Sequence, residues 1–437
     1  MGILAMILAG GKGERLYPLT QHRAKPAVPF GGIYRIIDFS LSNCINSGIR
    51  KIAVLTQYKS MSLDKHLRLG WNLFSGELNE YVISIPPQQR VGEKWYQGTA
   101  DAIYQNIYMI EKDAPEHLLV LAGDHIYKMD YAEMFRFHKE KKADATVAAI
   151  EVPIKQASAF GVIEVDDLYR IIGFEEKPQK PKHIPGKPDL AFVSMGIYLF
   201  NTRNVVEHLK FDALRDTAHD FGKNIIPEMM KTSLVYAYNF KDENKKEAKY
   251  WRDVGTIDAY WEANMDLVAV DPLLNLYDRS WPIRTYQAQN PPAKFVFAQE
   301  EKGGRLGIAL DSIVSHGCII SGGRVQNSVL SPSVRINSYA DVRQSILMEN
   351  VEIGRHCRIR RAIIDKDVIV PPGTEIGYDL EEDRKRFYVS PSGIVVIEKG
   401  ALIHENAAPK SVLEHRASGT PDPAGLTRPY VPSSADV

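Results

Sequence analysis

Cysteine is scarce in this sequence, and the three cysteines that occur are isolated. Cys44, Cys318 and Cys357 lie far apart among 437 residues, and none has a partner at the spacing of a metal-binding pair. A disulfide framework or a zinc site is therefore not expected, and a reducing compartment is favoured.

Net charge and long apolar runs are also lacking. Basic and acidic residues number 54 each, which argues against a protein that binds nucleic acid through bulk charge. The apolar start, residues 1–10, is shorter than the roughly 18 residues of a membrane span and lacks the flanks of a signal peptide. We therefore expect a soluble, cytoplasmic protein that binds neither nucleic acid nor membranes.

Short apolar runs alternate with helical stretches in the first 270 residues. Four such runs stand at residues 3–9, 51–56, 118–122 and 145–150. The stretch 99–112 has apolar positions near helical spacing, with Thr99 as its expected N-cap. This alternation predicts a mostly parallel sheet covered on both faces, with a ligand site at the carboxyl ends of its strands. Gly10–Gly13 and Asp124 directly follow such runs and are expected at that edge.

The pattern changes beyond a first domain of residues 1–270. Residues 271–300, rich in proline, asparagine and aromatic residues, are expected to be a packed linker. Residues 301–404 carry apolar residues at a six-residue period, as in Val351, Cys357, Ile363 and Ile369. That period is typical of a parallel β-helix, and a β-sandwich with accidental spacing is the alternative. Residues 405–437 have few large apolar side chains and are predicted to be a disordered tail.

The sequence LAGGKGER places a glycine-rich turn directly after the first predicted strand. Gly10, Gly11 and Gly13 would let backbone N–H groups approach phosphate oxygens, although such glycines often form only a tight turn. The motif is neither a Walker A loop nor a dinucleotide fingerprint. Arg15 and Lys25 add two cations beside the turn, and together they favour an anion site over an ordinary turn and a surface lysine.

Two aspartates and a Glu-Lys pair complete the residues with chemical potential. Asp124 in LAGD and Asp253 in YWRDVGT stand in separate loops and are candidate ligands for Mg²⁺, although either could merely cap a helix. Glu176 and Lys177 in FEEKP could bind sugar hydroxyls and a phosphate. For this pair taken alone, an exposed run of charges is the favoured interpretation.

Taken together, these segments resemble the bacterial ADP-glucose pyrophosphorylases, or glucose-1-phosphate adenylyltransferases, from about residue 3 to residue 395. The glycine loop, AGD and EKP are shared by sugar-nucleotide pyrophosphorylases generally. The segments RIIDFSLSNCINSGIR, WYQGTADA and YWRDVGT resemble this branch in particular. The resemblance implies a Rossmann-like nucleotidyltransferase domain with a mostly parallel mixed sheet, followed by a left-handed parallel β-helix. It also implies a homotetramer that commits glucose to glycogen synthesis.

The resemblance further implies roles for individual residues. ATP would be bound by Gly10, Gly11, Gly13, Arg15, Gly98 and Thr99. Glucose 1-phosphate would be bound by Tyr96, Gly161, Glu176, Lys177 and Ser194. Asp124 and Asp253 would hold Mg²⁺, and the catalytic residues would be Arg15, Lys25, Asp124 and Lys177. A phosphate oxygen of glucose 1-phosphate would then attack the α-phosphorus of ATP, so catalysis would consist of positioning and charge neutralisation.

Allosteric effectors are a further implication of the resemblance. His22, Arg35, Arg384 and Arg386 match positions associated with an anion pocket between the domains. The enteric-type pattern has lysine in place of His22 and histidine in place of Pro29. Because histidine is only partly charged near pH 7, fructose 1,6-bisphosphate is not expected to be the main activator, and fructose 6-phosphate and pyruvate stay open as alternatives.

Three other functions stay open at this point. The same chemistry could use another pair of substrates, such as GTP with mannose 1-phosphate. The chain could be a catalytically silent regulatory subunit, although its charged residues favour an active one. The β-helix could instead carry an acyltransferase site with His316 or His356 as the catalytic histidine, although neither stands in a recognisable motif.

Overall fold

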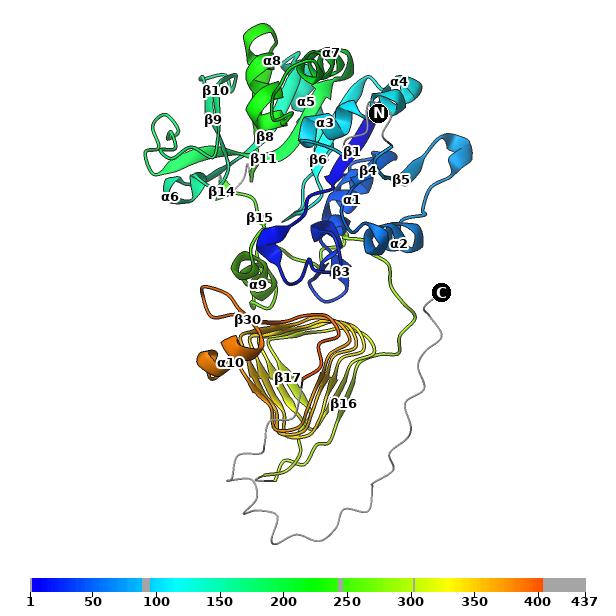
Figure 1. The fold of residues 1–437 in the computed structure, drawn as a ribbon, viewed down its shortest axis with the longest axis vertical. Helices are drawn as coiled ribbons and strands as arrows, with labels where there is room; N and C mark the ends of the chain where they lie inside the picture. Colours follow the sequence, from blue (N-terminus) through cyan, green and yellow to red (C-terminus); the bar gives the residue numbers. More distant parts are fainter. Residues whose placement is uncertain (1, 89–94, 243–246, 302, 404–437) are drawn as a thin grey trace.

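The protein consists of a layered α/β domain above a triangular stack of short strands (Figure 1). The structure is a computed structural model that describes residues 2–88, 95–242, 247–301 and 303–403. The tail predicted for residues 405–437 lies outside the described residues. No helix in these ranges is both long enough and apolar enough to cross a membrane.

A nine-stranded mixed sheet forms the centre of the N-terminal domain. Its parallel part consists of β5 (Tyr81–Ile85), β4 (Lys51–Thr56), β1 (Ile3–Ala9) and β6 (His117–Ala122). Its other part consists of β11 (Leu190–Asn201), β8 (Ala145–Pro153), β12 (Val235–Asn239), β9 (Gly161–Val165) and β10 (Ile171–Glu176). β11 runs antiparallel to β6, β8 and β9, which makes the sheet mixed. The four predicted apolar runs are confirmed as strands.

Helices cover both faces of this sheet. They are α1 (Ile37–Asn46), α2 (Met61–Gly70), α3 (Thr99–Tyr104), α4 (Ile107–Asp113), α5 (Tyr131–Glu140), α6 (Ile154–Ala157), α7 (Thr202–Ala213) and α8 (Ile226–Thr232). A further helix, α9 (Ile257–Asp266), lies instead between this domain and the next (Figure 1). Alternate residues of β1 belong to two separate buried clusters: Ile3 and Ile7 to one, Leu4 and Met6 to the other. A strand buried on both faces needs apolar residues at every position, which explains its continuous apolar run.

The single helix expected over residues 99–112 is wrong in two respects. The chain forms α3 and α4 with a break between them, where Asn106 has φ −107° and ψ 15°. The side-chain amide of Asn106 donates to the backbone carbonyl of Ala102 and to the hydroxyl of Tyr96, while its backbone N–H donates to the carbonyl of Ile103. The N-cap of α3 is Gly98, and Thr99 is already the first helical residue.

The second domain is a parallel β-helix made of three sheets. Its strands are short, from β16 (Lys294–Val296) to β31 (Val395–Ile397), and α10 (Leu380–Arg386) and β30 (Tyr388–Val389) are inserted before the last strand. Residues from successive coils stack in register, as Val325, Val342 and Ile359 do, and these side chains fill the interior. The predicted period is confirmed for Val351 and Cys357, which are buried.

Two details of the β-helix prediction need correction. β16 pairs with the later strand β19 (Ile319–Ser321), so the stack begins within residues 271–300, which were expected to form only a linker. The predicted phase is wrong for Ile363 and Ile369. Ile363 packs in the cluster between the domains and Ile369 is 64% exposed, while the interior holds their neighbours Ala362, Ile364, Val368 and Val370. The inward phase therefore shifts by one residue before Ala362.

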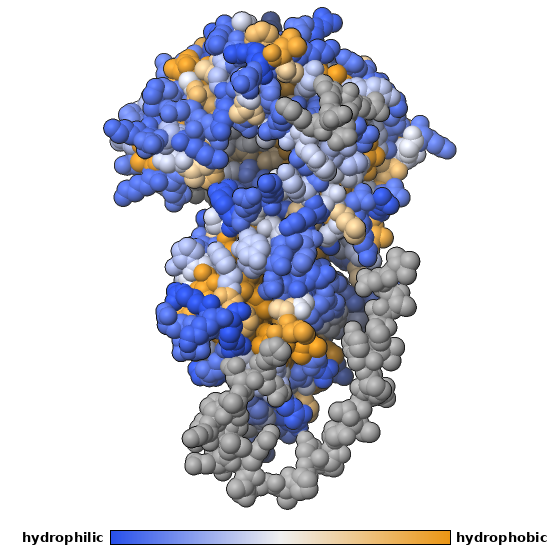
Figure 2. Space-filling model, in the orientation of Figure 1, coloured by the Kyte–Doolittle hydropathy of each residue, from blue (hydrophilic) through white to orange (hydrophobic). Residues whose placement is uncertain are grey.

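The two domains pack against each other through an apolar cluster and buried polar contacts. Phe30 and Tyr260 from the first domain share this cluster with Ile363 from the second. Beside it, Arg23 donates two hydrogen bonds of 2.9 Å to the carboxylate of Asp365. In the same orientation, Figure 2 shows a mostly hydrophilic surface, with apolar residues gathered over part of the β-helix.

Candidate active site

A cavity of about 660 Å³ opens at the carboxyl ends of β1, β4 and β6. Many predicted site residues line it: Gly10, Gly11, Gly13, Arg15, Lys25, Tyr96, Gly98, Thr99 and Asp124. The first of these follow β1, and Asp124 follows β6. The cavity therefore lies where a sheet of this type exposes the loops after its parallel strands.

The glycine turn after β1 forms one wall of the cavity. Gly13 has φ +65°, a left-handed conformation that strongly favours glycine, and a Cβ there would approach Thr20 and Lys25 to about 3 Å. A Cβ on Gly11 would meet no atom within 4 Å, so this part of the turn is open. The side chain of Arg15 extends into solvent, and its Nη2 lies 3.9 Å from Asp253 Oδ2. The turn thus combines open backbone with an exposed positive charge.

Lys25 joins the two aspartates. Its Nζ lies 2.9 Å from Asp124 Oδ2 and 2.9 Å from Asp253 Oδ1. Burial lowers the pKa of Lys25, but the two carboxylate charges outweigh burial and raise it above its usual value. Burial alone would raise the pKa of Asp124, but the charges of Lys25 and His125 outweigh it and lower the pKa to about 2. Both groups are therefore charged at neutral pH.

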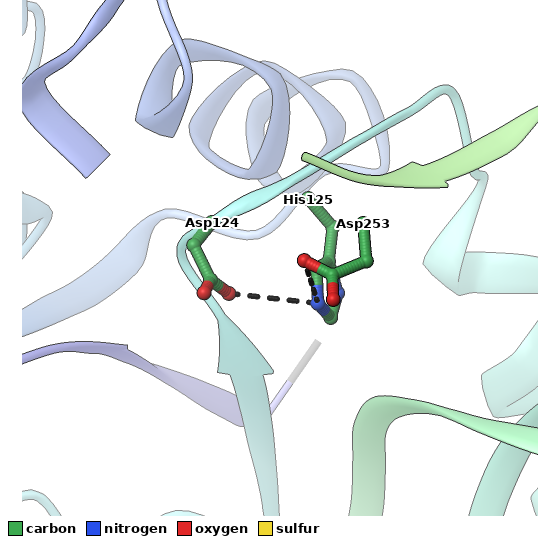
Figure 3. A group of neighbouring side chains, drawn as sticks. All are labelled: Asp124, His125 and Asp253. Carbon is green, nitrogen blue, oxygen red and sulfur yellow. Dashed lines mark ion pairs between the residues drawn. The ribbon is translucent and has the colours of Figure 1, made fainter. Parts of the chain in front are cut away.

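Strand pairing brings Asp253 to this place. β15 (Trp251–Asp253) runs antiparallel to β7 (His125–Tyr127), so that Asp253 lies opposite His125. Ligand atoms of Asp124, His125 and Asp253 all lie within 4.8 Å of one another (Figure 3). The imidazole Nε2 of His125 is 3.6 Å from Asp124 Oδ1 and 3.9 Å from Asp253 Oδ1.

The donor set fits a Mg²⁺ ion that also binds phosphate oxygens. Asp253 ends strand β15 and does not stand in a loop as expected, but its carboxylate and that of Asp124 still provide hard oxygen ligands from two separate segments. Mg²⁺ usually keeps several waters or phosphate ligands beside such carboxylates. Lys25 occupies one oxygen of each carboxylate. The other two, Asp124 Oδ1 and Asp253 Oδ2, make only the longer contacts of 3.6 and 3.9 Å and could bind a metal. The residues present are thus compatible with the expected metal.

The remaining predicted sugar-phosphate residues form a second group along β9, β10 and β11. Glu176 ends β10 and lies against Gly161, where a Cβ would come within 2.8 Å of Glu176 Oε2. Lys177 follows with a largely exposed side chain whose Nζ is 3.5 Å from Glu176 Oε1. Ser194 is buried in β11 and accepts a hydrogen bond from the backbone of Gly196. None of these four predicted residues lines the 660 Å³ cavity.

Comparison with known proteins decides the family. The Nucleotidyl transferase family model matches residues 4–269, and a model of the GlmU-like C-terminal hexapeptide matches residues 291–397. A glucose-1-phosphate adenylyltransferase of Rhodopirellula baltica is 57% identical over 403 residues, covering 92% of this chain and 90% of the relative. Those of Koribacter versatilis and Methylococcus capsulatus are both 56% identical, with 92% and 91% of this chain and 97% and 94% of the relatives covered. The chain belongs to the glucose-1-phosphate adenylyltransferase family.

Membership of the glucose-1-phosphate adenylyltransferase family confirms the resemblance drawn from the sequence motifs. The chain is accordingly a nucleotidyltransferase. The hexapeptide match also confirms the expected fold class, a nucleotidyltransferase domain followed by a left-handed parallel β-helix.

The four candidate effector residues do not gather at one place in the structure. Arg35 lines a small cavity of about 80 Å³ between the domains, whose lining also includes His66, His316, Glu349 and Lys366. His22 is exposed and does not line that cavity. On α10, Arg384 pairs with Glu381 at 2.7 Å, and the guanidinium of Arg386 lies over the ring of Phe387.

Sequence reasoning missed two residues at the main site. His125 directly follows the LAGD motif and faces both aspartates, so its position beside Asp124 was the available signal. Asp220 in the segment DFGKNIIP accepts a 2.9 Å hydrogen bond from the hydroxyl of Thr99. No local pattern indicates that contact, because it joins residues 121 positions apart.

Proposed function

We propose that this chain transfers the adenylyl group of ATP to α-D-glucose 1-phosphate, giving ADP-glucose and pyrophosphate, with Mg²⁺ as cofactor. The observation that carries the proposal is that Lys25 contacts both Asp124 and Asp253 beside the glycine-lined cavity. Relatives named glucose-1-phosphate adenylyltransferase at 57% and 56% identity support the choice of substrates.

On this proposal the glycine loop and its neighbours bind ATP. Backbone N–H groups of Gly10, Gly11 and Gly13 hold the phosphates, and Arg15 neutralises their charge. Gly98 and Thr99, which line the same cavity, bind the nucleoside end. The openness around Gly11 supports this assignment, because a phosphate can approach that backbone closely.

Glucose 1-phosphate is assigned to the second group of residues. Glu176 accepts bonds from sugar hydroxyls, with Gly161 leaving room beside it, and Lys177 holds the phosphate. Tyr96 and Ser194 complete this set. The exposed side chain of Lys177 supports its role, because an unburied ammonium is available to an incoming anion.

Charge neutralisation is the main contribution of the protein to catalysis. A phosphate oxygen of glucose 1-phosphate forms a bond to the α-phosphorus of ATP, and the bond to the departing pyrophosphate breaks. The attacking oxygen is already anionic, so no strong general base is needed. Asp124 and Asp253 would hold the Mg²⁺, which would supply Lewis-acid stabilisation of the phosphate oxygens. Lys25 keeps both carboxylates in place and adds positive charge beside the transferred group.

The physiological role proposed for the enzyme is commitment of glucose to glycogen synthesis in the cytoplasm. We assign catalysis to residues 1–270, and regulation and assembly into a homotetramer to the β-helix. Small-molecule effectors would act through the region between the domains, where Arg35 lies. Fructose 6-phosphate and pyruvate are candidate activators.

A substrate panel tests the proposal. Pyrophosphate release is measured with Mg²⁺ for ATP, GTP, UTP and dTTP, each with glucose 1-phosphate or mannose 1-phosphate, and with and without the effectors. Turnover confined to ATP with glucose 1-phosphate is expected. Preference for another pair would contradict the substrate assignment, and a folded protein without turnover would indicate a silent regulatory subunit.

A further inference from the structure

The N-terminus of α3 is capped by a distant backbone carbonyl rather than by a side chain. The N-cap residue of α3 is Gly98, which has no side chain to accept hydrogen bonds from the first turn of the helix. Instead the N–H groups of Ala100 and Asp101 donate to the carbonyl oxygen of His219, at 2.8 and 3.3 Å. Two of the unpaired donors at this helix end are thereby satisfied by a residue much further along the chain.

The same two segments touch at Gly98 and Thr99, which line the proposed nucleotide cavity. A Cβ on Gly98 would lie 2.3 Å from the carbonyl oxygens of both Ala218 and His219. The Thr99 hydroxyl donates to the carboxylate of Asp220. Residues 98–99, which form this part of the cavity wall, therefore pack directly against residues 218–220. The position of the wall depends on the position of that segment.

His219 adopts a conformation that needs support. Its φ of +49° lies in the left-handed region, which few residues other than glycine, asparagine and aspartate adopt. Its Nδ1 lies 2.8 Å from Asp212 Oδ2, on α7, and its backbone N–H donates to the Thr217 hydroxyl. Thr217 Oγ1 in turn donates to Asp212 Oδ1 at 2.9 Å. The carboxylate of Asp212 is buried, so these contacts are shielded from water.

We propose that His219, held by Asp212 and Thr217, is a positioning residue for the nucleotide. His219 does not line the cavity. It positions the carbonyl that caps α3, and thereby the cavity wall at Gly98 and Thr99. The inference rests on the proposed function, because it assumes that ATP binds against this wall. It adds to that function a determinant of ATP affinity that lies behind the cavity.

The test compares His219→Ala with a matched control. His138 offers the control, because its Nδ1 also lies 2.8 Å from a side-chain oxygen, here the Thr146 hydroxyl, in a buried place outside the cavity lining. The dissociation constant of ATP is measured by titration calorimetry on the full chain with Mg²⁺ and without glucose 1-phosphate. The KM of each substrate, kcat and the thermal midpoint are measured alongside.

For His219→Ala we expect the dissociation constant and KM of ATP to rise about tenfold, the effect of losing one charge-assisted contact. The kcat and the KM of glucose 1-phosphate should stay within about threefold. His219→Asn should restore much of the ATP affinity, because asparagine tolerates the left-handed region and its amide can donate to Asp212. His138→Ala should lower the thermal midpoint without weakening ATP binding.

Unchanged ATP affinity in His219→Ala, or an equal loss in His138→Ala, would overturn the inference. Should His219→Ala not fold, Thr217→Ala removes only the supporting hydroxyl and should still raise the ATP dissociation constant about threefold; an unchanged constant would overturn the inference. The two proposals can be told apart. If the wild-type protein turns over ATP and the variants bind ATP normally, only the positioning role of His219 is contradicted. Wild type that binds no ATP contradicts both.

Discussion

Lys25 donates a 2.9 Å hydrogen bond to Asp253 across 228 residues of sequence. Its second bond, to Asp124, makes the ammonium the centre of a site built from three separate segments of the chain, with Asp253 at the end of β15. Oxygen atoms of the Asp124 and Asp253 carboxylates lie within 4.8 Å of each other, and two negative charges so close repel unless a cation lies between them. Lys25 thus holds the pair together in the free protein and leaves one oxygen of each carboxylate for a metal.

Replacing Asp124 with asparagine tests this site. The substitution keeps the size of the side chain but removes the charge that binds Lys25 and the proposed Mg²⁺. We expect kcat/KM to fall by about 10²–10³ with the fold unchanged, as for other preorganised electrostatic contacts. Pyrophosphate release and circular dichroism give the two measurements.

Asp278→Asn is the matched control for charge. Asp278 pairs with Lys128 at 3.4 Å and does not line the active-site cavity, so this variant should keep nearly full activity. Near wild-type activity of Asp124→Asn would remove Asp124 from the catalytic set.

A methyl group at Gly98 should be poorly tolerated. The new Cβ would lie 2.3 Å from two backbone carbonyl oxygens, so α3 or residues 218–219 must move. We expect Gly98→Ala to lower the free energy of unfolding by about 1–3 kcal/mol and to weaken ATP binding. Urea denaturation and ATP titration measure the two effects.

Gly76→Ala provides the comparison for Gly98→Ala. A Cβ on Gly76 would meet no atom within 4 Å, so the free energy of unfolding of Gly76→Ala should differ little from that of the wild type. Equal stability of the two variants would mean that the contact at Gly98 relaxes without cost.

The two residues of the buried ion pair between the domains, Arg23 and Asp365, should depend strongly on each other for their contribution to stability. The side chains of Arg23 and Asp365 are only 5% and 2% exposed. Removing one partner leaves an unpaired buried charge, so Asp365→Asn or Arg23→Met should each lower the free energy of unfolding by about 3–5 kcal/mol. The double variant should lose less than the sum of the two single losses. Strict additivity in urea denaturation would show that the pair does not act as a unit.

Acid should destabilise the protein partly through His138. Burial lowers the pKa of His138 from 6.5 to about 4, so the native state disfavours its protonation. Its contribution to stability is therefore complete above pH 6.5 and is lost as the pH falls from 6.5 towards 4, by up to about 1.4 kcal/mol per pH unit. Unfolding free energies at several pH values should fall less steeply for His138→Gln than for wild type. Parallel pH dependence in the two proteins would contradict this assignment.

Much of the fold follows from local patterns in the sequence. Continuous apolar runs such as residues 3–9 predict strands buried on both faces, because each successive side chain meets a different layer of helices. The six-residue period predicts a β-helix, because each flat side of a coil repeats one inward position. The glycine turn after β1 and the cations Arg15 and Lys25 likewise indicate an anion site, because all of them lie within one short stretch of the chain.

Only the tertiary structure decided which distant residues meet. The pairing of β15 with β7 brings Asp253 beside Asp124, and no spacing along the chain encodes that pairing. The break between α3 and α4 depends on the side-chain bonds of Asn106, and the cap of α3 comes from His219. Periodicity reports which face of an element is buried. Contacts between loops depend instead on how whole elements pack, and this is why the sequence indicated the chemistry of the site but not its assembly.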